Sequence, residues 1–371
     1  MMDKKIYIHI GGPKTGTTAL QLFLAQNRQA LERKGFCYPG NEDAHWGICA
    51  NLQEHTLNGI QARPHTFVRR CIAEILRSSC HTSILSAECL AGQGSAAILR
   101  ELIPRSLDVR VIYYARRQDF LIESWYNQMV KSSRYRMTTR LDEESLRKIY
   151  PVMLFDHTRV ITPWAESFGR DNVIIRCYEK RQMQGDIIRD FAAATALSVD
   201  ETFSRPGEKI NSSLDRYHTE FIRLCNQAFF DAPEINDFFI EHRFHQSRFF
   251  ENRPNQSLLS PKARIEILEN YEGSNQHIAR EYLGRDDGHL FYDPWPDPDD
   301  LWESPRSLTA EDLEPIITEM ITNLDLQQRK KEPLATLLRY LNTAARKGKL
   351  IVPEAIRRAI GVRADRLKKP A

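Results

Sequence analysis

A lysine and three threonines lie in a glycine-rich turn near the start of the chain. Residues 11–18 read Gly-Gly-Pro-Lys-Thr-Gly-Thr-Thr and follow isoleucines that alternate along residues 6–10. Beyond Thr17 the apolar spacing becomes helical, so a strand is expected to pass through the turn into a helix. The amides of such a turn and the helix N-terminus point at one spot and attract an anion, typically a phosphate. Lys14 adds a positive charge at the crest.

The position of this lysine separates the turn from the usual nucleotide-triphosphate loop. Gly11 and Gly16 have the spacing of G-x-x-x-x-G-K-[ST], but Thr17 occupies the lysine position of that motif. Lys14 stands three residues earlier, where it would lie over a shorter anionic group. The alternative is an ordinary strand-to-helix turn that binds nothing.

Two side chains could accept a proton near this turn. Glu88 follows an expected strand at residues 81–86, and ligands of open α/β sheets bind beyond the carboxyl ends of strands. A carboxylate there can act as a general base, or it can simply be the first-turn acid or cap of a helix. His45, beside Trp46, could face an acceptor sugar or serve as the base. The alternative for His45 is a surface or core-edge histidine.

An arginine and a serine form the next constellation. Arg116 ends an apolar strand expected at residues 108–115, and Ser124 follows eight residues later on the next helix. A guanidinium binds a phosphate through two parallel hydrogen bonds, and a serine two helical turns on can donate to the same group. Arg117 could share that phosphate.

Residues 13–18 resemble the 5′-phosphosulfate loop of sulfotransferases that use 3′-phosphoadenosine 5′-phosphosulfate (PAPS). Arg116 and Ser124 resemble the 3′-phosphate site of the same family, although Arg117 and Gln118 depart from its usual Asn or Asp and Pro. The resemblance covers about residues 4–291 and is closest to bacterial members. It implies that Arg116 and Ser124 hold the 3′-phosphate. It further implies a 5′-phosphosulfate site made of Gly12, Pro13, Lys14, Thr15, Gly16, Thr17 and Thr18.

Two further nucleotide contacts follow from the same resemblance. Tyr178, at the end of an expected strand, would lie near the adenine, with core packing as the alternative. Lys209, in a polar loop before a helix, would help to close that loop over the nucleotide.

The function implied is transfer of a sulfuryl group from PAPS to a hydroxyl or amine, with no metal. Glu88, or His45 in its place, would be the base, and Lys14 would neutralise the leaving oxygen. A carbohydrate or glycolipid is the expected acceptor, because the glycan-modifying members place glutamate at the base position. The alternatives are a P-loop kinase or nucleotide-triphosphate hydrolase, and a non-catalytic nucleotide-binding scaffold.

The elements that would position these residues indicate an α/β protein. We expect a P-loop-containing, three-layer fold with a central parallel sheet flanked by helices. A Pro- and Asp-rich stretch at residues 292–302 marks a boundary, so residues 1–300 would form the sulfotransferase-like domain and residues 301–371 a helical, basic extension. The pattern also predicts an edge strand at 36–39, a strand at 173–178 and one helix over 17–34.

Composition limits the remaining possibilities. The 371 residues are 42% apolar and 27% charged, and no window of about 18 uncharged apolar residues exists. Seven scattered cysteines predict reduced thiols, and a strand starting within five residues leaves no room for a signal peptide, so we expect a cytoplasmic protein. A net charge of +3 predicts no nucleic-acid partner. Residues 340–371 alone carry +7 and could rest on an anionic membrane face.

Overall fold

The computed structural model describes residues 4–48, 66–92, 94–132, 134–207, 216–228 and 257–304. The chain divides into two compact units whose segments alternate along the sequence. The first unit holds the described parts of Met1–Ile122, Arg147–Ser212 and Lys262–Pro298, and the second holds those of Glu123–Leu146, Ser213–Pro261 and Asp299–Ala371.

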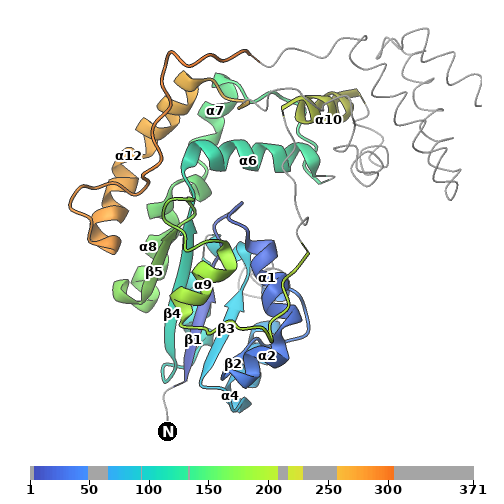
Figure 1. Cartoon of the computed structure of the whole chain (residues 1–371), viewed down its shortest axis with the longest axis vertical. Helices are drawn as coiled ribbons and strands as arrows, with labels where there is room; N and C mark the ends of the chain where they lie inside the picture. Colours follow the sequence, from blue (N-terminus) through green and yellow to red (C-terminus); the bar gives the residue numbers. More distant parts are fainter. Residues whose placement is uncertain are drawn as a thin grey trace, which may run out of the picture. The chain divides into compact units, whose positions relative to one another are not determined.

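A five-stranded parallel sheet forms the centre of the first unit (Figure 1). Its strand order is β2-β3-β1-β4-β5, and every pair of neighbours is parallel. The carboxyl ends of all five strands therefore meet at one edge of the sheet. The strands are β1 (Lys5–His9), β2 (Phe36–Cys37), β3 (Thr82–Ser86), β4 (Asp108–Ala115) and β5 (Val173–Cys177).

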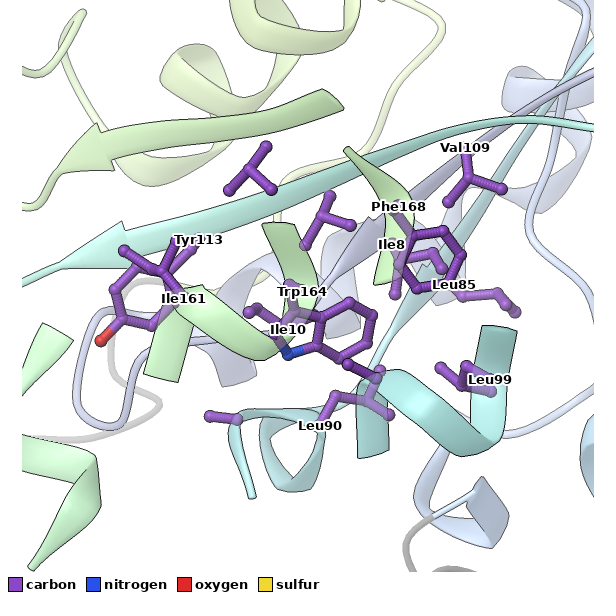
Figure 2. Packing of buried hydrophobic residues seen from close by; sticks show 14 of the residues in the cluster. Ile8, Ile10, Leu85, Leu90, Leu99, Val109, Tyr113, Ile161, Trp164 and Phe168 are labelled. Carbon is purple, nitrogen blue, oxygen red and sulfur yellow. The ribbon is translucent and has the colours of Figure 1, made fainter. Parts of the chain in front are cut away.

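Helices cover both faces of this sheet. On one face Ile8, Ile10 and Tyr113 belong to one buried cluster with Leu99 of α5 (Ser95–Leu102) and Trp164 of α8 (His157–Phe168), whose residues Figure 2 labels. The helix α4 (Thr66–Arg77) contributes to the same cluster. Because both faces are covered, the strands are apolar on both sides, which is typical of a parallel sheet.

The opposite face carries a second cluster. Tyr7, Ile112 and Tyr114 of the sheet pack there with side chains of α1 (Thr17–Gln26), α2 (Arg28–Arg33) and α9 (Ile187–Thr195). The arrangement is helix, sheet, helix, so the predicted three-layer α/β fold with a parallel sheet is confirmed. The predicted edge strand at residues 36–39 is also present, as β2, but it ends at Cys37.

The helix expected over residues 17–34 is instead two helices, broken at Asn27. The Asn27 Nδ2 donates to the carbonyls of Phe23 and Ser204, at 2.7 and 2.8 Å, and its Oδ1 accepts from the Ser204 amide at 2.8 Å. An asparagine side chain that bonds to backbone groups competes with the helical ladder. Asn27 therefore ends α1 and fastens residue 204, a partner that helical periodicity could not reveal.

In sequence order, the remaining helices follow β4 or β5. These are α6 (Gln118–Lys131), α7 (Glu143–Ile149), α10 (Arg216–Ala228) and α12 (Pro261–Leu283), with short 3-10 turns η2 (Glu88–Ala91), η3 (Met153–Phe155) and η4 (Arg170–Asn172). Within the second unit, Asn226 of α10 donates to the carbonyls of Val130 and Met137, both at 2.9 Å. None of the described helices is both long enough and apolar enough to cross a membrane. The predicted boundary near residue 300 stays a prediction, because residues 305–371 lie outside the described chain.

The thiols differ from expectation at one position. Cys89 is disulfide-bonded, whereas Cys37, Cys71, Cys80 and Cys177 are free and buried. The expectation of reduced thiols is therefore wrong at Cys89. Disulfide formation depends on how closely two cysteines approach in the fold, and irregular spacing along the chain does not report that distance.

Candidate functional site

Four neighbouring strands deliver polar groups to the same edge of the sheet. The glycine-rich loop, residues 11–18, follows β1, and Glu88 follows β3 after one intervening residue. Arg116 and Tyr178 come directly after β4 and β5. Since β3, β1, β4 and β5 are consecutive in the sheet, these groups lie side by side beyond its carboxyl ends, where open α/β sheets bind ligands.

Backbone geometry explains the two glycines that open the loop. Gly12 has φ of +149°, and a Cβ placed on it would lie 2.0 Å from the Tyr114 carbonyl oxygen. Gly11 has φ of +80°, and a Cβ there would lie 3.1 Å from the Cα of Glu88. Only glycine fits so close to β4 and to residue 88. The loop therefore runs tightly between the two neighbouring strand ends before it rises to Lys14.

Two loop threonines have different roles. Thr15 is buried and its Oγ1 donates to the Gly12 carbonyl at 2.7 Å, which braces the loop internally. Thr17, the first residue of α1, is only 2% exposed, and its Oγ1 has no hydrogen-bond partner in the described part of the chain. Gly16, before it, caps α1 in the left-handed conformation without a side-chain hydrogen bond. A buried hydroxyl without a partner costs free energy, so an oxygen-bearing anion at this helix N-terminus would satisfy it.

The charged groups of the site are coupled to one another. Burial lowers the pKa of Lys14, the negative charge of Glu88 opposes that change, and the positive charge of Arg116 adds to it. The Arg116 Nη1 also donates to the Lys14 carbonyl oxygen at 2.5 Å. The structure thus brings together Lys14, Glu88 and Arg116, although Lys14 and Arg116 are 102 positions apart in the sequence. Lys14 itself has φ of +64°, a conformation uncommon for a residue with a side chain.

Tyr178 lies against both the loop and Arg116. The Arg116 Cζ is 5.7 Å from the centre of the Tyr178 ring, within the range of a cation–π contact. The phenol oxygen lies 3.4 Å from the point that a Cβ on Gly16 would occupy. Tyr178 also packs at the edge of the cluster formed by α1 and α9, so the core-packing alternative describes part of its environment.

Glu88 is half-buried and begins the 3-10 turn η2. The preceding Ala87 amide donates to the His9 carbonyl at 3.1 Å, which fixes the end of β3 beside the end of β1. Glu88 is therefore a first-turn acid, as the structural alternative holds, and its charge also acts on Lys14.

The surroundings of His45 do not suit its expected role as the alternative base. It is 1% exposed, its Nδ1 accepts from the Ser86 amide at 3.0 Å, and its Nε2 donates to the Pro39 carbonyl at 2.9 Å. Burial lowers the pKa of His45 to about 4. Both ring nitrogens are thus occupied by backbone groups, and a base needs a free one. The geometry supports the core-edge alternative for His45.

Arg117 is engaged away from the loop. It is buried, and its Nε and Nη2 each donate to the Asp119 carboxylate at 2.9 Å, while its Nη1 donates to the carbonyls of residues 293 and 294. Arg264 also binds Asp119, at 2.6 Å. Next to this cluster Gln118 and Asn275 exchange two hydrogen bonds, at 2.8 and 3.0 Å. The alternative in which Arg117 shares a phosphate is therefore not supported, because its donors already have acceptors.

Two expected contacts remain predictions. Ser124 lies on α6 but falls in the second unit, so no geometry links it to Arg116. Lys209 lies outside the described residues. In the described part of the chain, no three His, Cys, Asp or Glu side chains gather into a possible metal site.

One residue beside the site, His157, was not expected there from the sequence. His157, the first residue of α8, lies between Tyr113 and the backbone of Arg116, with its Nδ1 2.8 Å from the Tyr113 hydroxyl and its Nε2 2.9 Å from the Arg116 carbonyl. The sequence offers a helix start at this point, since Asp156 caps the amides of Thr158 and Arg159. It contains no signal that residue 157 reaches Arg116.

Comparison with known proteins found few relatives. No family model matches the chain. A protein of Archaeoglobus fulgidus, described as uncharacterized, is 27% identical over 176 residues, which is 47% of this chain and 46% of that protein. The chain therefore matches a little under half the length of this relative. The crystal structure of a sulfotransferase from Alicyclobacillus acidocaldarius aligns with 17% identity and a TM-score of 0.34, over 61% of this chain and 93% of that chain. Neither match assigns a function to this chain.

Proposed function

We propose that this protein transfers a sulfuryl group from PAPS to a hydroxyl or amine of a carbohydrate or glycolipid. One observation carries the proposal: Lys14, Glu88 and Arg116 lie just beyond the carboxyl ends of three neighbouring strands, and the Arg116 guanidinium donates to the Lys14 carbonyl. This combination provides a cation for a leaving oxygen, a proton acceptor and a second phosphate ligand. A triphosphate loop explains the glycines but not the displaced lysine or Arg116.

The donor would bind along the glycine-rich loop. The Thr17 hydroxyl, which has no partner among the described residues, and the first amides of α1 fit the oxygens of a 5′-phosphate. Thr18 beside them is exposed. Arg116 would hold the 3′-phosphate, helped by Ser124. Arg116 would then distinguish this donor from ATP, which has no 3′-phosphate. Tyr178 would lie next to the nucleotide through its contacts with Gly16 and Arg116, and Lys209 would cover it.

The chemistry would be an in-line displacement at sulfur. PAPS, when bound, supplies the sulfuryl group. The bond from sulfur to the bridging phosphate oxygen breaks while the bond to the acceptor oxygen or nitrogen forms, and charge builds on the leaving phosphate. Lys14 would neutralise this charge, and Glu88 would take the acceptor proton. The proposed mechanism uses no metal.

The acceptor class and the location are also proposed. Trp46 is 53% exposed, and its turn is fixed to the end of β3 because the His45 amide donates to the Ser86 carbonyl at 3.1 Å. Ser86 lies two residues before Glu88, and an exposed aromatic ring fixed beside this strand end suits a sugar. The basic residues 340–371 would bring the protein to an anionic inner membrane face, where a glycolipid is presented. We therefore place the protein in the cytoplasm, where it would reach both the inner membrane face and the glycolipid.

Nucleotide-dependent thermal stabilisation tests the donor. Adenosine 3′,5′-bisphosphate should raise the melting temperature more than AMP at the same concentration, because only the bisphosphate has the group assigned to Arg116. Stabilisation by ATP with Mg²⁺ but not by the bisphosphate would indicate a kinase or nucleotide-triphosphate hydrolase instead.

Transfer itself needs a second assay. Radiolabelled PAPS is incubated with a panel of polysaccharides, glycolipids and phenols, and label is followed into the acceptor, with Lys14→Ala as the matched inactive control. Label in a glycan that is absent with Lys14→Ala supports the proposal. Tight binding of the bisphosphate without transfer to any acceptor would indicate a non-catalytic scaffold.

A further inference from the structure

We propose that His157 is a positioning residue that holds Arg116 ready to bind the 3′-phosphate of the donor. The inference rests on the proposed function, since it assigns Arg116 to that phosphate. His157 does not touch the ligand in this proposal. It acts through the backbone of Arg116, by a chain of hydrogen bonds that starts in the core of the sheet.

The chain of hydrogen bonds begins at Tyr113, which is fully buried in β4. Its hydroxyl lies 2.8 Å from the Nδ1 of His157, and the opposite ring nitrogen, Nε2, lies 2.9 Å from the Arg116 carbonyl. A carbonyl can only accept, so Nε2 carries the proton and donates. Nδ1 is then an acceptor, and the Tyr113 hydroxyl donates to it. Each ring nitrogen has one matched partner.

The neutral form of the ring suits this position. Burial lowers the pKa of His157 to about 4, so the ring is neutral at physiological pH and has one donor and one acceptor. The backbone of His157 is also held in place, because His157 is the first residue of α8 and the Asp156 carboxylate caps that helix. Ser274 donates to the same carboxylate at 2.6 Å. The donor to Arg116 is thus held by a fixed helix start.

The position of the contact explains why it matters for the site. The strands β4 and β5 are in register up to Ala115, which lies opposite Cys177. Arg116 is the first residue beyond this pairing, and its carbonyl is the one that His157 holds. Fixing that peptide restricts the backbone dihedrals of Arg116 and so directs its side chain. The Arg116 guanidinium in turn donates to the Lys14 carbonyl, so the same chain reaches the crest of the loop.

Binding of two nucleotides to three variants tests the inference. Dissociation constants are measured by calorimetry for adenosine 3′,5′-bisphosphate and for AMP. His157→Leu should weaken bisphosphate binding about tenfold, because a small misplacement of a positioned group is costly, and leave AMP nearly unchanged. His157→Gln, whose amide can still donate to the Arg116 carbonyl, should retain most of the preference. Tyr113→Phe removes only one hydroxyl and should lose about threefold to fivefold, the scale of one neutral hydrogen bond.

A double-mutant cycle separates positioning from general structural support. If His157 acts through Arg116, His157→Leu should cost nothing further for the bisphosphate in an Arg116→Ala background. Additive losses, or equal losses for AMP and the bisphosphate, would overturn the inference. Should His157→Leu not fold, the same cycle with Tyr113→Phe decides, and an unchanged nucleotide preference in Tyr113→Phe would overturn it. Wild-type protein that does not prefer the bisphosphate to AMP would instead refute the proposed function.

Discussion

Replacing Glu88 with glutamine perturbs the proposed chemistry with little change of shape. The variant keeps the size of a half-buried side chain at the end of β3 but loses the proton acceptor. General-base catalysis contributes about 10²–10⁴-fold, so kcat should fall by that factor, or by about 2.7–5.4 kcal/mol in the barrier. Affinity for adenosine 3′,5′-bisphosphate should stay within about threefold, because Glu88 is assigned to the acceptor.

The same substitution should change the pH dependence in a direction that the structure sets. The charge of Glu88 raises the pKa of Lys14 against the lowering by burial, so Glu88→Gln should lower that pKa further. The alkaline limb of kcat, which follows loss of the Lys14 proton, should therefore move to lower pH. Arg116 lowers the same pKa, so Arg116→Ala should move the limb to higher pH. General destabilisation would not produce opposite signs.

The assay measures initial rates of label transfer from radiolabelled PAPS between neutral and alkaline pH, at saturating donor. Glu101→Gln, an exposed acid on α5, is the matched control and should leave both rate and profile unchanged. Turnover within about threefold of wild type, roughly 0.7 kcal/mol, would refute Glu88 as the base. An alkaline limb that moves upward in Glu88→Gln would refute the coupling to Lys14. Loss of nucleotide affinity would give Glu88 a structural role.

Four further outcomes are expected. Lys14→Ala should abolish transfer without unfolding the protein. The control Lys5→Ala, at the opposite end of β1, should keep full activity. Activity of Lys14→Ala within about threefold of wild type would contradict the mechanism. Thr17→Val should leave the ligand-free protein as stable or more stable, because it removes a buried hydroxyl that no described residue bonds, yet weaken nucleotide binding about fivefold by calorimetry. The folded pKa of His45 is about 4 against about 6.5 in the unfolded chain, so its contribution to stability is complete above about pH 6.5 and falls toward pH 4. His157 adds a similar loss of its own, so urea unfolding should show that His45→Gln loses about 2 kcal/mol less stability than the wild type between pH 7 and pH 5. Truncation after Arg339 should abolish any sedimentation with acidic vesicles that falls with salt; unchanged binding would place the anchor elsewhere.

Local patterns were enough to predict the layout of the first unit. Alternation in residues 6–10 and the apolar run at 108–115 identify strands, and the change to helical spacing after Thr17 identifies the turn between β1 and α1. Parallel pairing then requires the carboxyl ends to share an edge, so Lys14, Glu88 and Arg116 were expected together. These inferences need only periodicity and topology, which are properties of neighbouring residues and of the order of elements.

Contacts between distant segments decided what each polar side chain does. Arg116 and Arg117 are adjacent and chemically identical in sequence, but Asp119 and the carbonyls near residue 293 take up Arg117, whereas Arg116 reaches the loop. The two ring nitrogens of His45 are bonded to the Pro39 carbonyl and the Ser86 amide, which leaves neither of them for catalysis. A hydrogen bond depends on where two groups meet in space, and chains of more than a hundred residues separate some of these partners. The sequence determined which chemistry was available at the sheet edge, and only tertiary packing determined which residues were left to perform it.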